Sequence, residues 1–155
     1  MQALTQSLPD EDETVLAAFS HNLSGVLPSA ADAVDAVADG SCYVGVATED
    51  LALQAADNGF SVTVVYPAEG TVIQPDCAAV VQGCLHEDNA RAFIDFLLSD
   101  EVQTRLTRQS RRAVRGQAAA SAALPRAMAY DAYAAGARQA ELLAIWQSLT
   151  AEAAS

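Results

Sequence analysis

The chain has 155 residues, 52% of them hydrophobic, with 20 acidic and 8 basic residues and a formal net charge of −12. This length and composition indicate a soluble globular protein of one domain or parts of two. The acidic charge argues against nucleic acid and anionic membrane as partners, because binding phosphate needs a basic surface. No apolar run is long enough to span a membrane, and the opening MQALTQSLPDEDE shows no signal peptide.

The first third of the chain is predicted to begin with a lead-in at residues 1–13, followed by a short helix at 14–23. Ser29 then has the side chain expected of a helix N-cap, and apolar residues recur after it at helical spacing. Gly40 ends that second helix, because glycine readily takes the left-handed conformation found at helix C-termini.

The next segment alternates between strand and helix patterns. SCYVGVAT, residues 41–48, predicts a strand, and residues 49–59 predict a helix that starts at two acids and ends at Asn-Gly. FSVTVVYP, residues 60–67, predicts a second strand. This alternation favours an α/β fold, in which the loops at the carboxyl ends of the strands form the ligand site.

The second half is predicted to be mainly helical. The clearest signal lies in residues 86–98, where apolar residues recur at i, i+3, i+4, i+7 and i+8. A strand is expected before this helix, at 72–83, and a further helix after it, from Ser99-Asp100 to Ser110. A basic surface loop, RRAVRG, and a small-residue linker at 116–125 follow. The last element is a helix or helix pair at 126–149, packed through Tyr133, Leu142, Ile145, Trp146 and Leu149.

Groups that carry chemistry are scarce. The sequence has two histidines, neither near a nucleophile at an informative spacing, and it has no GxSxG, HExxH, P-loop or GxGxxG motif. Cys42, Cys77 and Cys84 form no CxxC pair and fit no zinc-binding spacing. We therefore expect no enzymatic activity, no cofactor and no metal centre.

The most suggestive group of residues is Thr48, Glu49 and Asp50, a hydroxyl and two carboxylates at a predicted strand-to-helix junction. Such a junction also offers free backbone N–H groups, so the group could hold solute hydroxyls or a cation. Alternatively, Thr48 or Asp50 only caps the helix. Ser29 leaves the same choice open, between an N-cap and an N-cap that also binds an anion.

All eight basic residues are arginines, and residues 1–90 hold 14 acids but no arginine. Five of the arginines lie within residues 105–115, where they could bind phosphate. A solvated helix end followed by a basic loop is the favoured interpretation, since arginines stabilise a helix C-terminus. The five are Arg105, Arg108, Arg111, Arg112 and Arg115.

Five pieces, taken in order, carry a family resemblance: SGVLPSAADAVDAVADGSCYVGVATEDLAL, VVYPAEGTVIQPDCAAVVQG, HEDNARAFIDFLLSDEVQ, RRAVR and YDAYAAGARQAELLAIWQSL. Together they resemble the C-terminal half of a bacterial extracellular solute-binding protein of the ABC-transporter type. The group it is most similar to contains binders of ferric iron, phosphonate and hexose phosphate.

The resemblance implies a type 2 periplasmic-binding-protein fold, in which two α/β lobes enclose the ligand. It implies part of lobe 2 at residues 14–68, a hinge crossing at 69–76 and the C-terminal part of lobe 1, mainly helical, at 77–155. Thr48, Glu49, Asp50 and Ser29 become candidate ligand residues, and Glu69 and Thr71 join them near the expected cleft floor.

The same resemblance bears on the ligand. Iron-binding members carry adjacent tyrosines just after the strand, where this chain has Asp50 and Leu51. That departure argues against ferric iron and favours a polyol or a phosphorylated organic solute, because a carboxylate accepts hydrogen bonds from hydroxyls. The implied role is non-catalytic solute binding for an ABC importer. An iron complex remains one of the possible solutes.

The resemblance further implies a small-molecule solute and an ABC permease as partners, and a periplasmic or extracellular location. Family members are about twice as long, so the chain is expected to be a truncated form that needs its missing N-terminal half or self-associates. The alternatives are a sensory or regulatory module of the same fold, an enzyme that adopted the fold, and a non-functional remnant.

Overall fold

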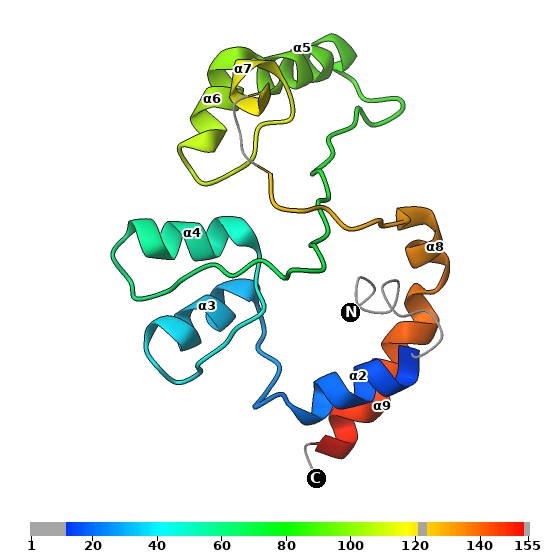
Figure 1. The fold of residues 1–155 in the computed structure, drawn as a ribbon. Helices are drawn as coiled ribbons and strands as arrows, with labels where there is room; N and C mark the ends of the chain where they lie inside the picture. Colours follow the sequence, from blue (N-terminus) through cyan, green and yellow to red (C-terminus); the bar gives the residue numbers. More distant parts are fainter. Residues whose placement is uncertain (1–11, 121–123, 154–155) are drawn as a thin grey trace. The chain divides into compact units, whose positions relative to one another are not determined.

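The structure is a computed structural model that describes residues 12–120 and 124–153. These residues form helices joined by turns and extended segments, and they contain no β-strand (Figure 1). In chain order the helices are α2 (Asp12–His21), α3 (Ala30–Ala38), α4 (Glu49–Asp57), α5 (Glu87–Leu97), α6 (Asp100–Thr107), α7 (Gly116–Ala120), α8 (Ala132–Ala137) and α9 (Gln139–Ala153).

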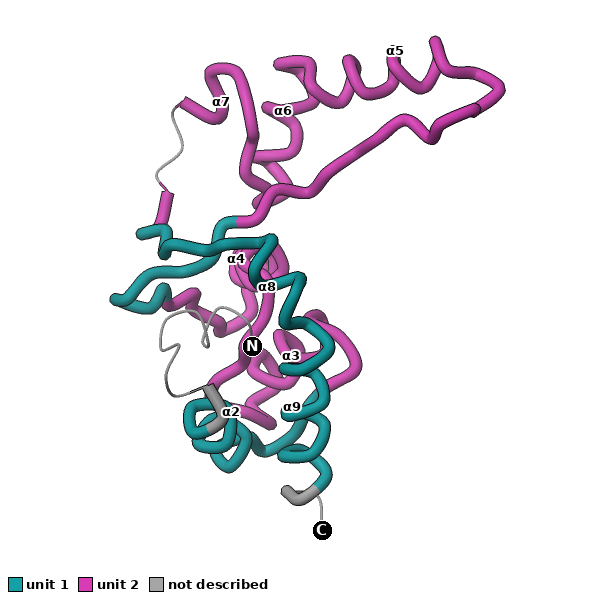
Figure 2. Tube along the Cα trace, turned by 90° about the vertical axis from the view of Figure 1, so that its right-hand side faces the viewer, with its two compact units in different colours: residues 1–26, 66–73, 126–155 teal, residues 27–65, 74–125 magenta. Residues whose placement is uncertain are grey.

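The chain divides into two compact units, coloured separately in Figure 2. Unit 1 comprises residues 1–26, 66–73 and 126–155, and unit 2 comprises residues 27–65 and 74–125. Each unit is thus assembled from segments that are distant in sequence. The lobe boundaries implied by the family resemblance remain a prediction.

Unit 1 is built on the packing of α2 against α9 (Figure 1). Leu16 and Leu142 are its most deeply buried apolar side chains, with exposed fractions of 0% and 2%. The rings of Phe19 and Trp146 meet with their centroids 6.0 Å apart at an interplanar angle of 34°. The predicted packing roles of Leu142 and Trp146 are confirmed, whereas Tyr133 is exposed.

A backbone bridge joins the middle segment of unit 1, residues 66–73, to residues 126–128. The Thr71 N–H donates to the Arg126 carbonyl at 2.9 Å, and the Met128 N–H donates to the Thr71 carbonyl at 3.0 Å. Gly70 has φ of +120°, and a Cβ there would lie 3.1 Å from the Arg126 oxygen and the Met128 nitrogen. Any larger residue would be strained, so glycine is required where residues 66–73 meet residues 126–128.

Unit 2 begins with α3, whose ends follow the predicted capping pattern. The Ser29 hydroxyl accepts from the Asp32 N–H at 3.2 Å, and Gly40 follows the helix with φ of +82°. Beside this end, hydrogen bonds from the Ser41 side chain and backbone lower the pKa of the Asp39 carboxyl below its usual value. The helix then packs against α4.

The other predicted helices form with ends close to those expected. Residues 49–59, 86–98 and 99–110 become α4, α5 and α6, and the C-terminal segment becomes the pair α8 and α9. The exception is the linker predicted at 116–125, because residues 116–120 form α7. Alanine has the highest helix propensity of any residue, which accounts for a turn of helix within GQAAA.

The predicted strands do not form among the described residues. Residues 41–48, 60–67 and 72–83 are extended or irregular, and the β pairing of the described chain is one isolated parallel bridge between Thr71 and Ala127. An extended segment becomes a strand only when a neighbour receives its backbone hydrogen bonds. The α/β class is therefore not confirmed, and the described chain is helix-rich.

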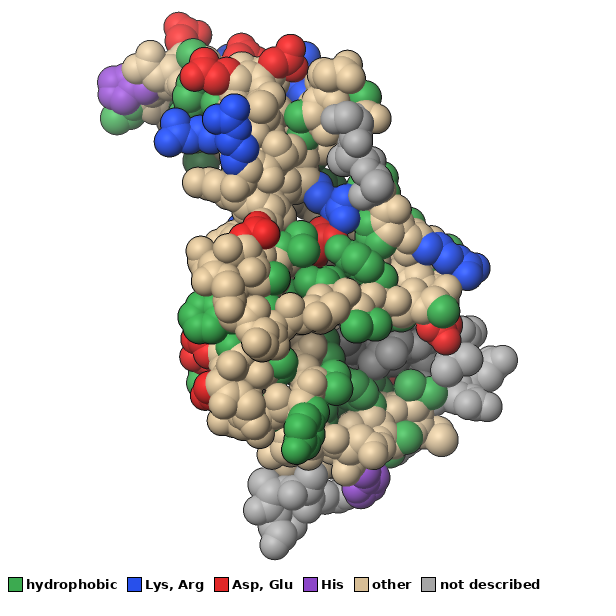
Figure 3. Space-filling view, turned by 60° about the vertical axis from the view of Figure 1, so that its left-hand side comes forward, with side chains coloured by type: hydrophobic (Ala, Val, Ile, Leu, Met, Phe, Trp, Pro, Cys, Tyr) green, Lys and Arg blue, Asp and Glu red, His purple; other side chains and the backbone are tan. Residues whose placement is uncertain are grey.

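Several large hydrophobic side chains in the extended segments remain open to solvent. Tyr43, Val44, Val46 and Val65 are all at least three-quarters exposed. Figure 3 shows hydrophobic side chains uncovered on one face of the molecule. Among the described residues, no helix is both long enough and apolar enough to cross a membrane.

Candidate functional site

The predicted ligand residues Thr48, Glu49 and Asp50 lie at the start of α4. Thr48 holds the N-cap position, with φ of −79° and ψ of 145°, but its hydroxyl makes no capping hydrogen bond. Thr48 therefore takes the N-cap position that the capping interpretation gives it, but it does not cap α4 through a side-chain hydrogen bond. Glu49 and Asp50 occupy the first turn, where the partial positive charge of the helix N-terminus stabilises carboxylates.

Glu49 is held by a two-pronged ion pair with Arg112. Nε of Arg112 donates to one carboxylate oxygen of Glu49 and Nη2 donates to the other, both at 2.6 Å. The side chain of Arg112 is 29% exposed and that of Glu49 is 24% exposed. This fork geometry matches the planar guanidinium to the carboxylate and is stronger than a single contact.

Asp50 pairs with the neighbouring arginine. Nε of Arg111 lies 2.9 Å from Oδ2 of Asp50, and Nη1 of the same guanidinium lies 2.7 Å from Oδ2 of Asp76. Asp50 is 17% exposed and Asp76 is 91% exposed, so the two contacts lie in different environments. Arg111 therefore connects the start of α4 to the segment that follows residue 73.

The end of α6 turns these two arginines toward α4. Ser110 has φ of 58°, the left-handed conformation, and follows the helix. The Ser110 N–H donates to the Thr107 carbonyl at 3.2 Å, and the Arg111 N–H donates to the Leu106 carbonyl at 3.1 Å. These two bonds form a Schellman motif, which terminates the helix and redirects the chain.

Gln103 fixes the other side of this turn. Its side chain is buried, donates from Nε2 to the Leu97 carbonyl at 2.9 Å and accepts from the Val114 N–H at 2.8 Å. A buried polar group must be hydrogen-bonded to be tolerated, and both ends of this amide are satisfied. Gln103 therefore anchors the chain just beyond Arg112, a role that the sequence did not suggest.

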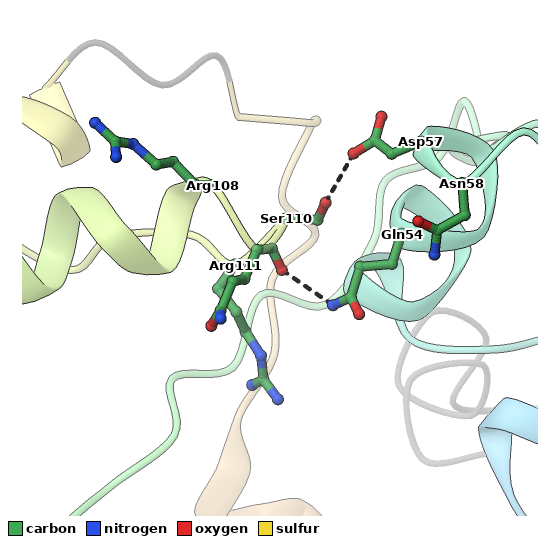
Figure 4. Close-up of a pocket in the computed structure, with 7 residues that line it drawn as sticks. Gln54, Asp57, Asn58, Arg108, Ser110 and Arg111 are labelled. Atoms are coloured by element: carbon green, nitrogen blue, oxygen red, sulfur yellow. Dashed lines mark hydrogen bonds between the residues drawn. The ribbon is translucent and has the colours of Figure 1, made fainter.

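A polar hollow of about 470 Å³ lies beside the second half of α4, against residues 108–111 (Figure 4). Gln54 donates from Nε2 to the Gln109 carbonyl at 3.0 Å, and Ser110 donates from its hydroxyl to Oδ2 of Asp57 at 3.3 Å. Asp50, Gln54 and Asp57 are spaced i, i+4 and i+7, which places them on one helix face. That polar spacing was the available signal for this contact.

The arginine-rich segment thus divides into two groups. Arg111 and Arg112 both pair with carboxylates of α4, which the prediction of a solvated basic loop did not include, although Arg111 is still half exposed. The cause is their opposite charge to Glu49 and Asp50, which lie 61 to 63 residues earlier in the chain. Arg105, Arg108 and Arg115 make no ion pair within the described residues.

The remaining candidates lie elsewhere. Ser29 caps α3, and its hydroxyl also donates to Oδ2 of Asp32 at 2.7 Å, so its side chain is already engaged. Glu69 and Thr71 belong to unit 1, where Thr71 forms the backbone bridge to Ala127. The structure therefore gathers Thr48, Glu49 and Asp50, and it leaves Ser29 apart at another helix.

The distribution of metal-binding side chains bears on whether the described part of the chain could hold an ion. No three His, Cys, Asp or Glu side chains gather there in a way that could hold an ion. Cys42, Cys77 and Cys84 form no disulfide within the described residues. At the start of α4, Glu49 and Asp50 take part in ion pairs.

A comparison with protein-family models matches residues 2–135 to the family described as bacterial extracellular solute-binding protein. The chain belongs to this family. No curated protein matches the chain significantly. No solved structure matches it significantly either.

Family membership assigns a binding role in transport. Proteins of this family are generally non-catalytic, are extracellular or periplasmic, and in general bind small molecules and act with ABC permeases. The start of α4 brings together the Thr48 hydroxyl, the carboxylates of Glu49 and Asp50, and the guanidinium groups of Arg111 and Arg112.

Proposed function

We propose that this chain serves as a solute-binding component of an ABC importer, with a type 2 periplasmic-binding-protein fold, and that the start of α4 contacts the solute. The observation that carries the site is the Thr48 hydroxyl. It is exposed, makes no capping bond and has no partner among the described residues, although it stands at the N-cap beside Glu49 and Asp50.

The solute that fits these groups is a small organic molecule with hydroxyl groups and an anionic group such as phosphate. Thr48 both donates and accepts, and Glu49 accepts from hydroxyls. The guanidinium groups of Arg111 and Arg112 match phosphate geometry, and an anionic solute would compete with Asp50 and Glu49 for them.

The wider proposal follows the family resemblance. Ser29, Glu69 and Thr71 are additional ligand candidates, residues 69–76 form a hinge between lobes, and the chain represents a truncated form of a longer solute-binding protein. The exposed Tyr43, Val44, Val46 and Val65 support a covering partner, either an N-terminal half or a second copy. Asp50 and Leu51 stand where iron-binding relatives carry tyrosines, so a bare ferric ion is disfavoured.

The test is a thermal-shift and calorimetric screen of the 155-residue chain against glucose 6-phosphate, a phosphonate, a polyamine, thiamine and a ferric salt. The best binder is then titrated into Thr48→Val and Glu49→Gln. We expect each substitution to weaken binding roughly tenfold or more, because each removes a hydrogen bond to a charged or polar solute group.

Glu87→Gln is the matched control, since Glu87 is an exposed acid that pairs with Arg91 on α5. It removes the same charge away from α4 and should leave the affinity unchanged. The proposal is wrong if no solute binds, or if Glu87→Gln weakens binding as much as Glu49→Gln does. The chain would then be better explained as a regulatory module or as a non-functional remnant.

A further inference from the structure

We infer that the hollow between the second half of α4 and residues 108–111 is a second small-molecule site, and that it takes a small zwitterion of the α-amino-acid type. It lies toward the opposite end of α4 from Thr48. Asp57 lies eight positions after Glu49, a distance of about 12 Å along a helix axis. The inference therefore does not rest on the solute site proposed at Thr48.

The first argument is that the hollow holds one acidic and one basic side chain, each without an oppositely charged partner among the described residues. Asp57 receives one hydrogen bond, from the neutral Ser110 hydroxyl at 3.3 Å, and no cation pairs with it within the described residues. Arg108 lines the same hollow and has no anionic partner in that part of the chain. A molecule that carries both an ammonium and a carboxylate satisfies Asp57 and Arg108 together.

The second argument is that two helix C-termini meet at the hollow. α4 ends at Asp57 and α6 ends at Thr107, and the lining residues Asn58 and Arg108 follow these ends directly. The carbonyl groups of a helix C-terminus carry partial negative charge, which favours a cation nearby. The C-terminus of α4 therefore favours the ammonium group beside Asp57, whereas the Arg108 guanidinium must offset the partial negative charge of the α6 terminus before it receives a carboxylate.

The remaining lining groups provide neutral hydrogen bonds at fixed positions. Gln54 is held by its bond to the Gln109 carbonyl, and the side-chain amide of Asn58 has no protein partner in the described chain (Figure 4). Arg111 is already engaged by Asp50 and Asp76, so its charge is largely compensated. This leaves Arg108 as the group that receives the ligand carboxylate.

Arg108 must turn to complete the site. In Figure 4 its guanidinium extends away from Asp57, on the α6 side of the hollow. The side chain is exposed, so the turn is a rotamer change at the surface and needs no opening of the core. Solvent exposure also means that the affinity is modest and falls as salt is added.

The experiment is ¹⁵N NMR titration of the whole chain with glycine, compared with acetate and methylammonium, which each carry one of its two charges. We expect glycine to shift the amides of residues 54–58 and 108–111 and to bind more tightly than either single-charge probe. Asp57→Asn and Arg108→Gln should each weaken glycine binding roughly tenfold or more, because each removes a charge-assisted hydrogen bond.

Asp95→Asn and Arg105→Gln are the matched controls, because they make the same charge changes at exposed residues of α5 and α6 outside the hollow. Both should retain the glycine affinity, as should Thr48→Val. The inference is overturned if glycine binds no better than acetate or methylammonium, if its shifts fall outside the hollow, or if Arg105→Gln weakens it as much as Arg108→Gln. Loss of glycine binding in Thr48→Val would instead assign the ligand to the start of α4.

Discussion

The contact between α2 and α9 in unit 1 and the contact between α4 and residues 108–112 in unit 2 are built from different chemistry. The first joins Leu16, Phe19, Leu142 and Trp146, and its leucines are almost completely buried. The second joins carboxylates and guanidinium groups through ion pairs, together with two hydrogen bonds, and most of its side chains reach solvent.

The difference separates stability from binding. Apolar packing contributes free energy in proportion to the area removed from water, and salt affects it little. Ion pairs that reach solvent contribute less, are screened by salt and retain groups that a solute can reach. We therefore expect substitutions in the α2–α9 contact to change the stability of unit 1, and substitutions on α4 to change binding and local stability.

The largest effect is expected for Leu142→Ala in α9. Leu142 is 2% exposed and Leu143 beside it is 45% exposed, so the two leucines form a matched pair. Leu142→Ala should lower the free energy of unfolding by about 2–5 kcal/mol, because it removes buried apolar contacts and leaves a cavity. Leu143→Ala should cost well under half as much.

The measurement is urea unfolding followed by tryptophan fluorescence. Trp146 is the sole tryptophan of the sequence and contacts Phe19, so its emission reports on unit 1. Equal losses in Leu142→Ala and Leu143→Ala would show that the α2–α9 contact is not the core of this unit.

A smaller effect is expected for the ion pair between Arg112 and Glu49. A double-mutant cycle with Arg112→Gln and Glu49→Gln should give a coupling energy of about 1–2 kcal/mol, because the pair is two-pronged and less than a third exposed. Hydrogen exchange of the α4 amides measures it. The coupling energy should decrease at high salt, while the urea midpoint of unit 1, followed by Trp146 fluorescence, stays unchanged.

The exposed pair between Arg91 and Glu87 on α5 provides the comparison. Its side chains are more than half exposed, so its cycle should give about 0.3–0.5 kcal/mol. If the two cycles give the same coupling energy, the fork geometry of Arg112 adds nothing to unit 2, and the α4 contact is then a surface association.

Helix ends could be predicted from sequence because their causes are local. Ser29 and Ser99 stand at N-caps and accept from the N–H three residues later, and Gly40 and Gly59 follow helix ends with positive φ. Each of these assignments depends on a few adjacent residues. The predicted strands failed for the converse reason, since a strand depends on a partner that local sequence does not name.

The candidate site was predictable in part. The position of Thr48, Glu49 and Asp50 at a helix start follows from the local pattern, and the structure places them there. The pairing of Glu49 with Arg112 spans 63 residues, and the charges alone do not show which arginine meets which acid. Gln103 could not be found from sequence, because a single polar residue in a helix gives no sign of burial.

The smaller of the two effects expected at the α4 contact concerns the backbone of Ser110, where the chain turns toward α4. Its φ of 58° places a serine in a conformation that glycine takes without strain, and its hydroxyl contacts Asp57. Both Ser110→Gly and Ser110→Ala lose the hydroxyl, and only the glycine relieves the strain. Ser110→Gly should therefore be more stable than Ser110→Ala by about 1 kcal/mol in hydrogen exchange of α6.

Thr104, within α6, provides a control of opposite sign, because there glycine should be less stable than alanine by about 1 kcal/mol. If alanine were the more stable substitution at both positions, Ser110 would not hold the left-handed turn in solution, and the geometry that brings Arg111 and Arg112 to α4 would need another cause.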